Sequence, residues 1–76
     1  MTLQIPNEDR YLTPGCKIRI GRFTTTVWLV NFGWFCFSGN REICGWYITD
    51  TSDPTRIRPI QKIDLTDIYF VEEATQ

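Results

Sequence analysis

The chain has 76 residues, a formal net charge of −1 and no histidine. A chain of this length holds one small core, which rarely supplies more than about 3–5 kcal/mol of stability without disulfides, a metal or oligomerisation. The near-neutral charge argues against a dedicated duplex-DNA binder, because such proteins need a basic excess to displace counterions. The absence of histidine excludes the Ser-His and Cys-His dyads, and no glycine-rich loop opens a helix, so we expect no catalytic residues and no enzymatic activity.

The cysteines Cys16, Cys36 and Cys44 bear on location and on cofactors. Their odd number, and the lack of a secretory signal pattern at the N-terminus, predict a cytoplasmic protein. No two of them have the close spacing of a zinc knuckle, so we predict no metal site and no cofactor. A disulfide between Cys36 and Cys44 across a hairpin stays open as an alternative. No segment reads as a transmembrane span, so no membrane association is expected.

The first third of the sequence predicts an N-terminal segment followed by one β-strand. β-branched and aromatic residues dominate throughout, and apolar positions recur with period two, so the predicted fold class is all-β. Residues 1–10 form an N-terminal arm or edge strand in this interpretation. The sequence Thr13-Pro14-Gly15 predicts a type II turn, because proline presets φ and glycine tolerates the positive φ that follows. Residues 16–20 then alternate as a half-buried strand that ends at Gly21.

The middle of the chain predicts a long hairpin at the centre of the fold. Residues 24–38 are strongly strand-forming and are interrupted only by Gly33. Residues 38–40 read as the turn and residues 41–49 as the returning strand, with Gly45 a bulge or a point of close approach. This hairpin is longer than an ordinary strand pair.

The last third predicts three short elements. A turn-rich loop covers residues 50–54, and residues 56–60 form a strand that Pro59 confines to an edge. Residues 64–67 form a single helical or 3₁₀ turn with an acidic cap, and residues 68–72 form the final strand. Residues 11–73 are therefore predicted as a single β-barrel domain, followed by a tail at residues 74–76.

The segment RIRPIQKIDLTDIYFVE, residues 56–72, carries a resemblance to a known architecture. A strand, a tight turn and a last strand follow one another there, as in the SH3-like small barrels. The resemblance implies a five-to-six-stranded barrel with a long bent central hairpin and one 3₁₀ turn before the last strand. The acidic loop and paired tyrosine motif of peptide-binding SH3 domains are missing, so recognition of proline-rich ligands is not implied. An OB-like barrel is the alternative fold.

Both faces of the predicted hairpin are apolar. Strict alternation from Val27 puts Trp28, Val30, Phe32, Trp34 and Cys36 on one face, and Val27, Leu29, Phe35 and Phe37 on the other. A bulge at Gly33 would shift the phase by one and keep both faces apolar. The returning strand sets Cys44, Trp46 and Ile48 against Ile43 and Tyr47. A large exposed apolar patch marks an interface, whereas a strongly bent strand would bury both faces in one core, and both interpretations stay open.

These patterns lead to two hypotheses on function. The first is a non-enzymatic protein-binding module that occupies or sterically blocks a surface of a larger protein, or that binds itself as a homo-oligomer. Small barrels are frequent among accessory proteins of phages and mobile elements, so an inhibitor of a host defence or regulatory enzyme is one concrete form. The second is single-stranded nucleic-acid binding, in which aromatic rings stack on bases while arginines, including Arg19, follow the phosphates. The candidate binding residues are Trp28, Trp34, Phe35, Trp46, Tyr47, Arg22, Arg56 and Arg58.

Overall fold

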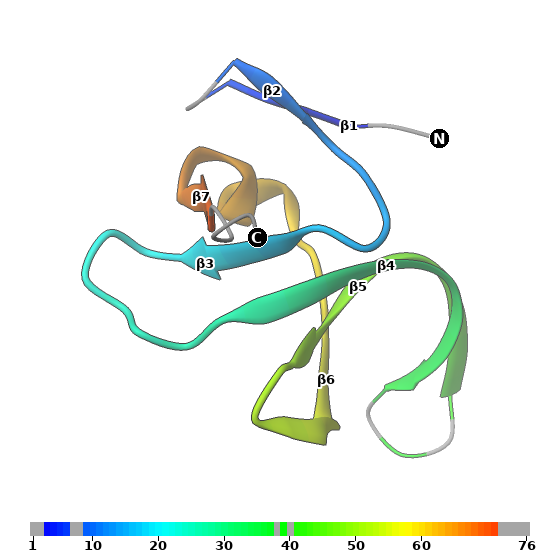
Figure 1. The fold of residues 1–76 in the computed structure, drawn as a ribbon. Coiled ribbons are helices and arrows are strands. Elements are labelled where there is room, and N and C mark those ends of the chain that lie inside the picture. Colours follow the sequence, from blue (N-terminus) through cyan, green and yellow to red (C-terminus); the bar gives the residue numbers. More distant parts are fainter. Residues whose placement is uncertain (1–2, 7–8, 38, 40, 72–76) are drawn as a thin grey trace.

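The computed structural model describes residues 3–6, 9–37, 39 and 41–71, and these residues confirm the all-β class (Figure 1). Their elements are β1 (Leu3–Ile5), β2 (Arg10–Leu12), β3 (Lys17–Ile20), β4 (Trp28–Phe37), β5 (Arg41–Asp50), β6 (Asp53–Pro59), the 3₁₀ helix η1 (Lys62–Thr66) and β7 (Ile68–Phe70). The expected order of a strand, a long hairpin, a short strand, a 3₁₀ turn and a last strand is confirmed. The predicted tail at residues 74–76 lies outside the described residues.

The larger sheet has five antiparallel strands in the order β6-β5-β4-β3-β7. β6 and β7 are its two edges, and within the described part of the chain they do not pair with each other. The closed barrel that the SH3-like resemblance implied is therefore wrong. The chain joins these two edges through η1 (Figure 1).

The N-terminal segment forms a hairpin of its own. β1 pairs with β2 in a two-stranded sheet, with Leu3 opposite Leu12. Ile5 and Leu12 are fully buried, and the Arg10 guanidinium lies 4.1 Å from the centre of the Phe70 ring. β1 lies in the segment predicted as an arm or edge strand, but β2 was not predicted, because residues 10–12 show too few alternations to indicate a strand. The hairpin covers the core above β3 (Figure 1).

One hydrophobic core lies between the five-stranded sheet, the N-terminal hairpin and η1. Its fully buried members come from six strands, all except β6, and they are Ile5, Leu12, Ile18, Val30, Ile48 and Ile68. Burial of a side chain of this size contributes about 1.5–3 kcal/mol. The predicted alternation in β3 is confirmed at Ile18, which faces the core while Lys17 and Arg19 lie on the other face.

The loop between β3 and β4 is longer than predicted. Residues 24–27 were expected to be strand, but β4 begins only at Trp28. The Thr24 hydroxyl donates to the Ile20 carbonyl at 2.8 Å and so competes with strand hydrogen bonding. Gly21 ends β3 as predicted, with a φ of +100° that L side chains rarely adopt.

The segment after β5 is also tighter than predicted. β6 begins at Asp53 instead of residue 56, so the expected loop shrinks to Thr51 and Ser52. Pro59 ends this edge strand, as predicted. The 3₁₀ turn begins at Lys62, two residues earlier than predicted, and its N-cap is Gln61. The expected acidic residue does take part in the cap, because the Asp64 carboxylate accepts a hydrogen bond from the backbone N–H of Gln61 at 2.9 Å.

Candidate functional site

The β4–β5 hairpin pairs without interruption along its whole length. Ten pairs run from Trp28 opposite Asp50 to Phe37 opposite Arg41, with no shift in register. Strict alternation is therefore confirmed over the alternative of a bulge at Gly33, and of the two interpretations of Gly45 the bulge is wrong. The two glycines instead lie opposite each other as one cross-strand pair.

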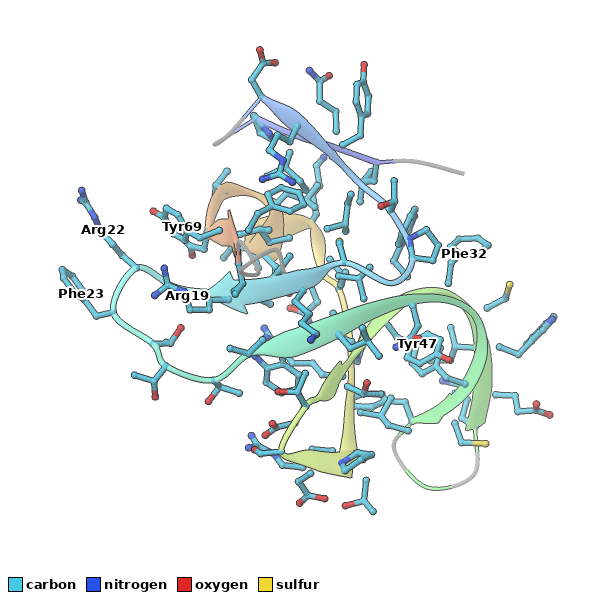
Figure 2. All side chains as sticks on the ribbon, in the orientation of Figure 1. Arg19, Arg22, Phe23, Phe32, Tyr47 and Tyr69 are labelled. Atoms are coloured by element: carbon cyan, nitrogen blue, oxygen red, sulfur yellow. The ribbon has the colours of Figure 1, made fainter. Side chains whose placement is uncertain are left out.

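This glycine pair is where the hairpin bends. Its missing side chains leave room on the inner, concave face, and Gly33 adopts a φ of +149° that disfavours other residues. The rings of Phe35 and Tyr47 come from either side of the pair and stack over it with their centroids 4.5 Å apart. Figure 2 shows Tyr47 inside the curve and Phe32 on its outer side. Glycine and aromatic residues together thus produce a curved ribbon with a filled inner face.

The outer face of the hairpin changes its environment at the bend. Before it, Trp28, Val30 and Ile48 lie in the core. Phe32, directly before the bend, is 37% exposed, and Trp34, beyond it, is 68% exposed. The Phe32 and Trp46 rings meet edge to face at 5.1 Å, as expected of a directly opposed pair. We call this surface the outer aromatic face, and its members are Phe32, Trp34, Cys36, Cys44 and Trp46.

Arg56 and Arg58 are each held by a buried carboxylate. Arg56 Nη1 lies 2.9 Å from Asp50 Oδ2, and Arg58 Nη2 lies 2.8 Å from Asp64 Oδ1. Hydrogen bonds from the backbone and hydroxyl of Ser52 lower the pKa of Asp50, and the charge of Arg56 adds to this effect. Both arginines keep donors free of these pairs, because a guanidinium carries five N–H groups.

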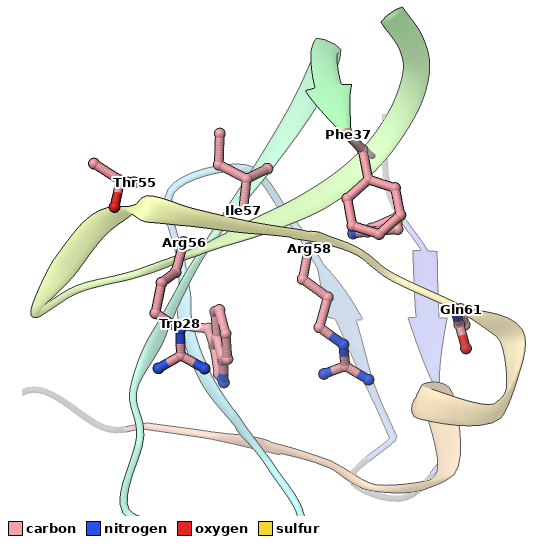
Figure 3. Close-up of a pocket in the computed structure, with 8 residues that line it drawn as sticks. Trp28, Phe37, Thr55, Arg56, Ile57, Arg58 and Gln61 are labelled. Atoms are coloured by element: carbon pink, nitrogen blue, oxygen red, sulfur yellow. The ribbon is translucent and has the colours of Figure 1, made fainter. Parts of the chain in front are cut away.

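A groove of about 450 Å³ follows β6 (Figure 3). Residues 55–59 line it along the strand, together with Trp28, Phe37 and Gln61. The side chains of Arg56 and Arg58 extend to the same side of β6 as Trp28, whereas Ile57 points the opposite way (Figure 3). The Arg56 guanidinium lies 5.4 Å from the centre of the Trp28 ring.

Arg22 lies apart from both surfaces. It is exposed in the β3–β4 loop beside Phe23, which is 92% exposed. Arg19 and Tyr69 are partners across β3 and β7 at the same end of the molecule (Figure 2). Arg19 Nη1 donates to the Thr24 carbonyl at 3.2 Å and so fixes the base of the loop.

The structure therefore divides the eight predicted binding residues among four places. Trp34 and Trp46 lie on the outer aromatic face, and Phe35 and Tyr47 fill the inner face of the bend. The groove along β6 brings together Trp28, Arg56 and Arg58, and Arg22 lies in the β3–β4 loop. Trp28 itself is buried in the core and presents little surface to a partner.

Sequence reasoning missed the carboxylates that hold the two arginines. Asp50 ends β5 and Asp64 lies in η1, and the signal for the first was the Asp50-x-Ser52 spacing of an Asx turn. For the pairing itself no local signal exists, because it depends on how β6 returns along β5.

The remaining features concern cysteines, metals and membranes. All three cysteines are free, and the register sets Cys44 opposite Trp34 and Cys36 opposite Glu42, so the two are not directly paired. Within residues 3–6, 9–37, 39 and 41–71, no group of three or more Cys, Asp or Glu side chains could hold a metal ion. No helix in that same part of the chain is long and apolar enough to cross a bilayer.

Comparison of the chain with protein-family models, with curated proteins and with solved structures finds no match.

Proposed function

We propose that the protein is a non-enzymatic binding module that attaches to a surface of a larger protein through its outer aromatic face. The exposure of Trp34 carries this proposal. An indole that is 68% exposed, beside Phe32 and Trp46 on a ribbon whose inner face is already filled, has no role in this core. Tryptophan is also the residue type most enriched at interface hot spots.

The rigidity of the hairpin supports the same proposal. Ten uninterrupted cross-strand pairs and the Phe35–Tyr47 stack hold the outer aromatic face in one shape before any partner arrives. A preorganised surface loses little conformational entropy on binding, so a few aromatic contacts suffice for affinity. Action by occupying a surface needs no catalytic group. An accessory protein of a phage or mobile element that blocks a host enzyme is one form that such action takes, and self-association is another.

Replacing Trp34 tests the proposal directly. The protein and its Trp34→Ser variant are used as baits for affinity capture from cells that express the protein, with quantitative mass spectrometry as the readout. Tyr11→Ser is the matched control, because Tyr11 is also a large exposed aromatic residue, 60% exposed, but lies on the N-terminal hairpin. We expect a captured protein to bind Trp34→Ser at least about 30-fold more weakly, the scale of one hot-spot residue.

One result of this experiment would contradict the proposal. Capture of the same proteins in the same amounts by all three baits would remove the outer aromatic face from consideration. Self-association is measured by analytical ultracentrifugation over a concentration series. A dimer that Trp34→Ser abolishes and Tyr11→Ser preserves identifies a second copy of the chain as the partner.

Single-stranded nucleic-acid binding is the second candidate function, and the β3–β4 loop favours it. Arg22 and Phe23 project from this loop near Arg19 and Tyr69, so cations and rings lie at one end of the molecule (Figure 2). Base stacking on such rings is worth about 1–3 kcal/mol per base. Fluorescence titration with a labelled oligonucleotide at low salt tests it: binding that falls steeply with added salt and with Phe23→Ser supports it, and no binding excludes it.

A further inference from the structure

We propose that the free edge of β6 is a second binding site, which takes an extended peptide segment whose residues alternate between acidic and apolar. This site lies on a different surface from the outer aromatic face. It would therefore stand even if the proposal for Trp34 failed.

The register shows which backbone groups the edge offers. The Ile60 N–H donates to the Trp46 carbonyl at 3.1 Å, so that pair is a hydrogen-bonded pair of the β5–β6 ladder. Hydrogen-bonded and non-hydrogen-bonded pairs alternate in antiparallel sheets. In the same register, Pro59 lies opposite Tyr47 and Ile57 lies opposite Thr49. Pro59 is one residue and Ile57 three residues before Ile60, so both belong to non-hydrogen-bonded pairs. The N–H and C=O of Ile57 and the C=O of Pro59 therefore point away from β5.

Neighbouring residues limit the open edge to this short stretch. The Thr55 N–H already donates to Asp53 Oδ1 at 3.2 Å. Pro54 and Pro59 have no N–H at the two ends of the strand. Prolines at an edge prevent long, unlimited strand pairing. They leave one donor, at Ile57, between them, so the edge fits a short segment rather than a long added strand.

The side chains of β6 differ between the two sides of this edge. Arg56 and Arg58 lie on the side of Trp28, and Ile57 points to the opposite side (Figure 3). Side chains of an added strand alternate between the same two sides. One set of its side chains would therefore contact the two guanidinium groups, and the other set would lie on the same side as the Ile57 side chain.

The charge on the arginine side selects acidic residues. The side chains of Arg56 and Arg58 are 59% and 38% exposed, while those of their partners Asp50 and Asp64 are only 5% and 6% exposed. The positive groups thus face the groove and the negative groups lie beneath them. Each guanidinium uses one N–H group in its ion pair with a carboxylate and keeps others for a ligand carboxylate.

The test uses two fluorescein-labelled heptapeptides, one alternating valine with glutamate and one alternating valine with lysine. Fluorescence anisotropy gives their affinities for the full chain. We expect the glutamate peptide to bind at least about tenfold more tightly, the scale of one hydrogen bond to a charged group. Equal affinity for the two peptides, or no binding of either, overturns the proposal.

Two variants with the same change of charge locate the site. Arg56→Gln removes a guanidinium from the groove and is expected to weaken binding of the glutamate peptide about tenfold. Arg22→Gln removes one from the β3–β4 loop and is expected to change it less than about twofold. Similar losses in both variants would show a nonspecific charge effect and overturn the site. Circular dichroism confirms that both variants fold.

The NMR amide signals of the unaltered protein give a test that does not depend on whether a variant folds. In ¹H–¹⁵N spectra the glutamate peptide should shift the amides of residues 55–58, and hydrogen exchange at Ile57 should slow at least about tenfold, because its N–H gains a partner. Shifts centred on Trp34 and Cys44 instead would assign the peptide to the outer aromatic face. Shifts of residues 55–58 by an oligothymidine but not by the peptide would assign the groove to nucleic acid. Either result overturns the proposal.

Discussion

The two halves of the β4–β5 hairpin have the same pattern of apolar residues but different surroundings. Near its base, Val30 and Ile48 lie opposite each other and are fully buried in the core. From Phe32, directly before the Gly33–Gly45 pair, to Trp34, directly after it, the same outer face is exposed. Neither the register nor the alternation changes between the halves. What changes is that the N-terminal hairpin and η1 cover the first half, and the bend carries the second half away from them (Figure 1).

A period of two therefore assigns a residue to one face of a strand, but it does not place that residue in the interior of the protein. The converse holds on the inner face, where a residue outside the main core is nevertheless buried: Phe35 is only 6% exposed. It is buried by Tyr47 and by the curvature of its own ribbon. Burial in a chain this small therefore depends on which neighbour reaches a position.

The largest expected effect is at the base of the hairpin. Ile48→Ala should lower the free energy of unfolding by about 2–5 kcal/mol, because it leaves a cavity in the core. This loss is close to the whole stability expected of a core this size. Urea denaturation followed by circular dichroism measures it. Ile63→Ala is the matched control at an exposed isoleucine, with an expected change below about 0.5 kcal/mol. Equal changes in the two variants would contradict the position of the core.

A smaller loss is expected in the second half. Phe35→Ala should cost about 2 kcal/mol, below the usual range for a core phenylalanine, because the Phe35–Tyr47 stack is a small cluster open at its edge. Amide hydrogen exchange should speed up beyond the Gly33–Gly45 pair and stay slow around Ile48. Uniform acceleration along the hairpin would show that its halves unfold as one unit. Phe23→Ala, at an exposed ring in the β3–β4 loop, should leave exchange unchanged.

The end of β5 at the base gives a dependence on pH. The pKa of Asp50 is lowered from its ordinary value of 3.8, chiefly by the hydrogen bonds from Ser52. A lowered pKa in the folded state means that folding favours the charged form. This contribution to stability is complete above pH 3.8 and is lost as the pH falls through the lowered value. Urea titrations at several acidic pH values should show a steeper loss for the protein than for Asp50→Asn. Identical pH profiles would contradict the role of Asp50.

The smallest effect on stability is expected at the outer aromatic face. Trp34→Ser should change the free energy of unfolding by about 0.5 kcal/mol or less, because the indole contacts little of its own chain. The same urea denaturation measures it. A loss near that of Ile48→Ala would show that Trp34 stabilises the fold, and the case for an interface would end. Trp46 gives a less clean test, because it also packs against the core.

Much of the fold could be predicted from local sequence rules. Alternation gave the two faces of the hairpin, Gly21 the end of β3, and Asp64 the cap of η1. The second strand of the N-terminal hairpin was missed because three residues are too few to show a period. The sequence left open a bulge at Gly33, and a bulge or a close approach at Gly45, because a glycine in a strand is compatible with each of these. Only the pairing of the two strands shows that the two glycines face each other.

The candidate site was less predictable than the fold. The sequence placed Trp34, Phe35 and Trp46 on the correct faces but could not tell which half of the hairpin the core would cover. The pairing of Arg56 with Asp50 and of Arg58 with Asp64 depends on the path of β6, and no spacing in the sequence reveals it. Contacts between distant segments decided both points.

If a partner binds over Trp34 as proposed, the bend at the Gly33–Gly45 pair sets the shape that this partner needs. Curving a ribbon draws its inner side chains together, as in the Phe35–Tyr47 stack, and spreads the outer ones apart. Phe32 and Trp34 therefore stand on a ridge and not on a flat sheet. A flat partner would touch only the crest of such a ridge, so a partner that binds tightly needs a hollow into which the crest can sink.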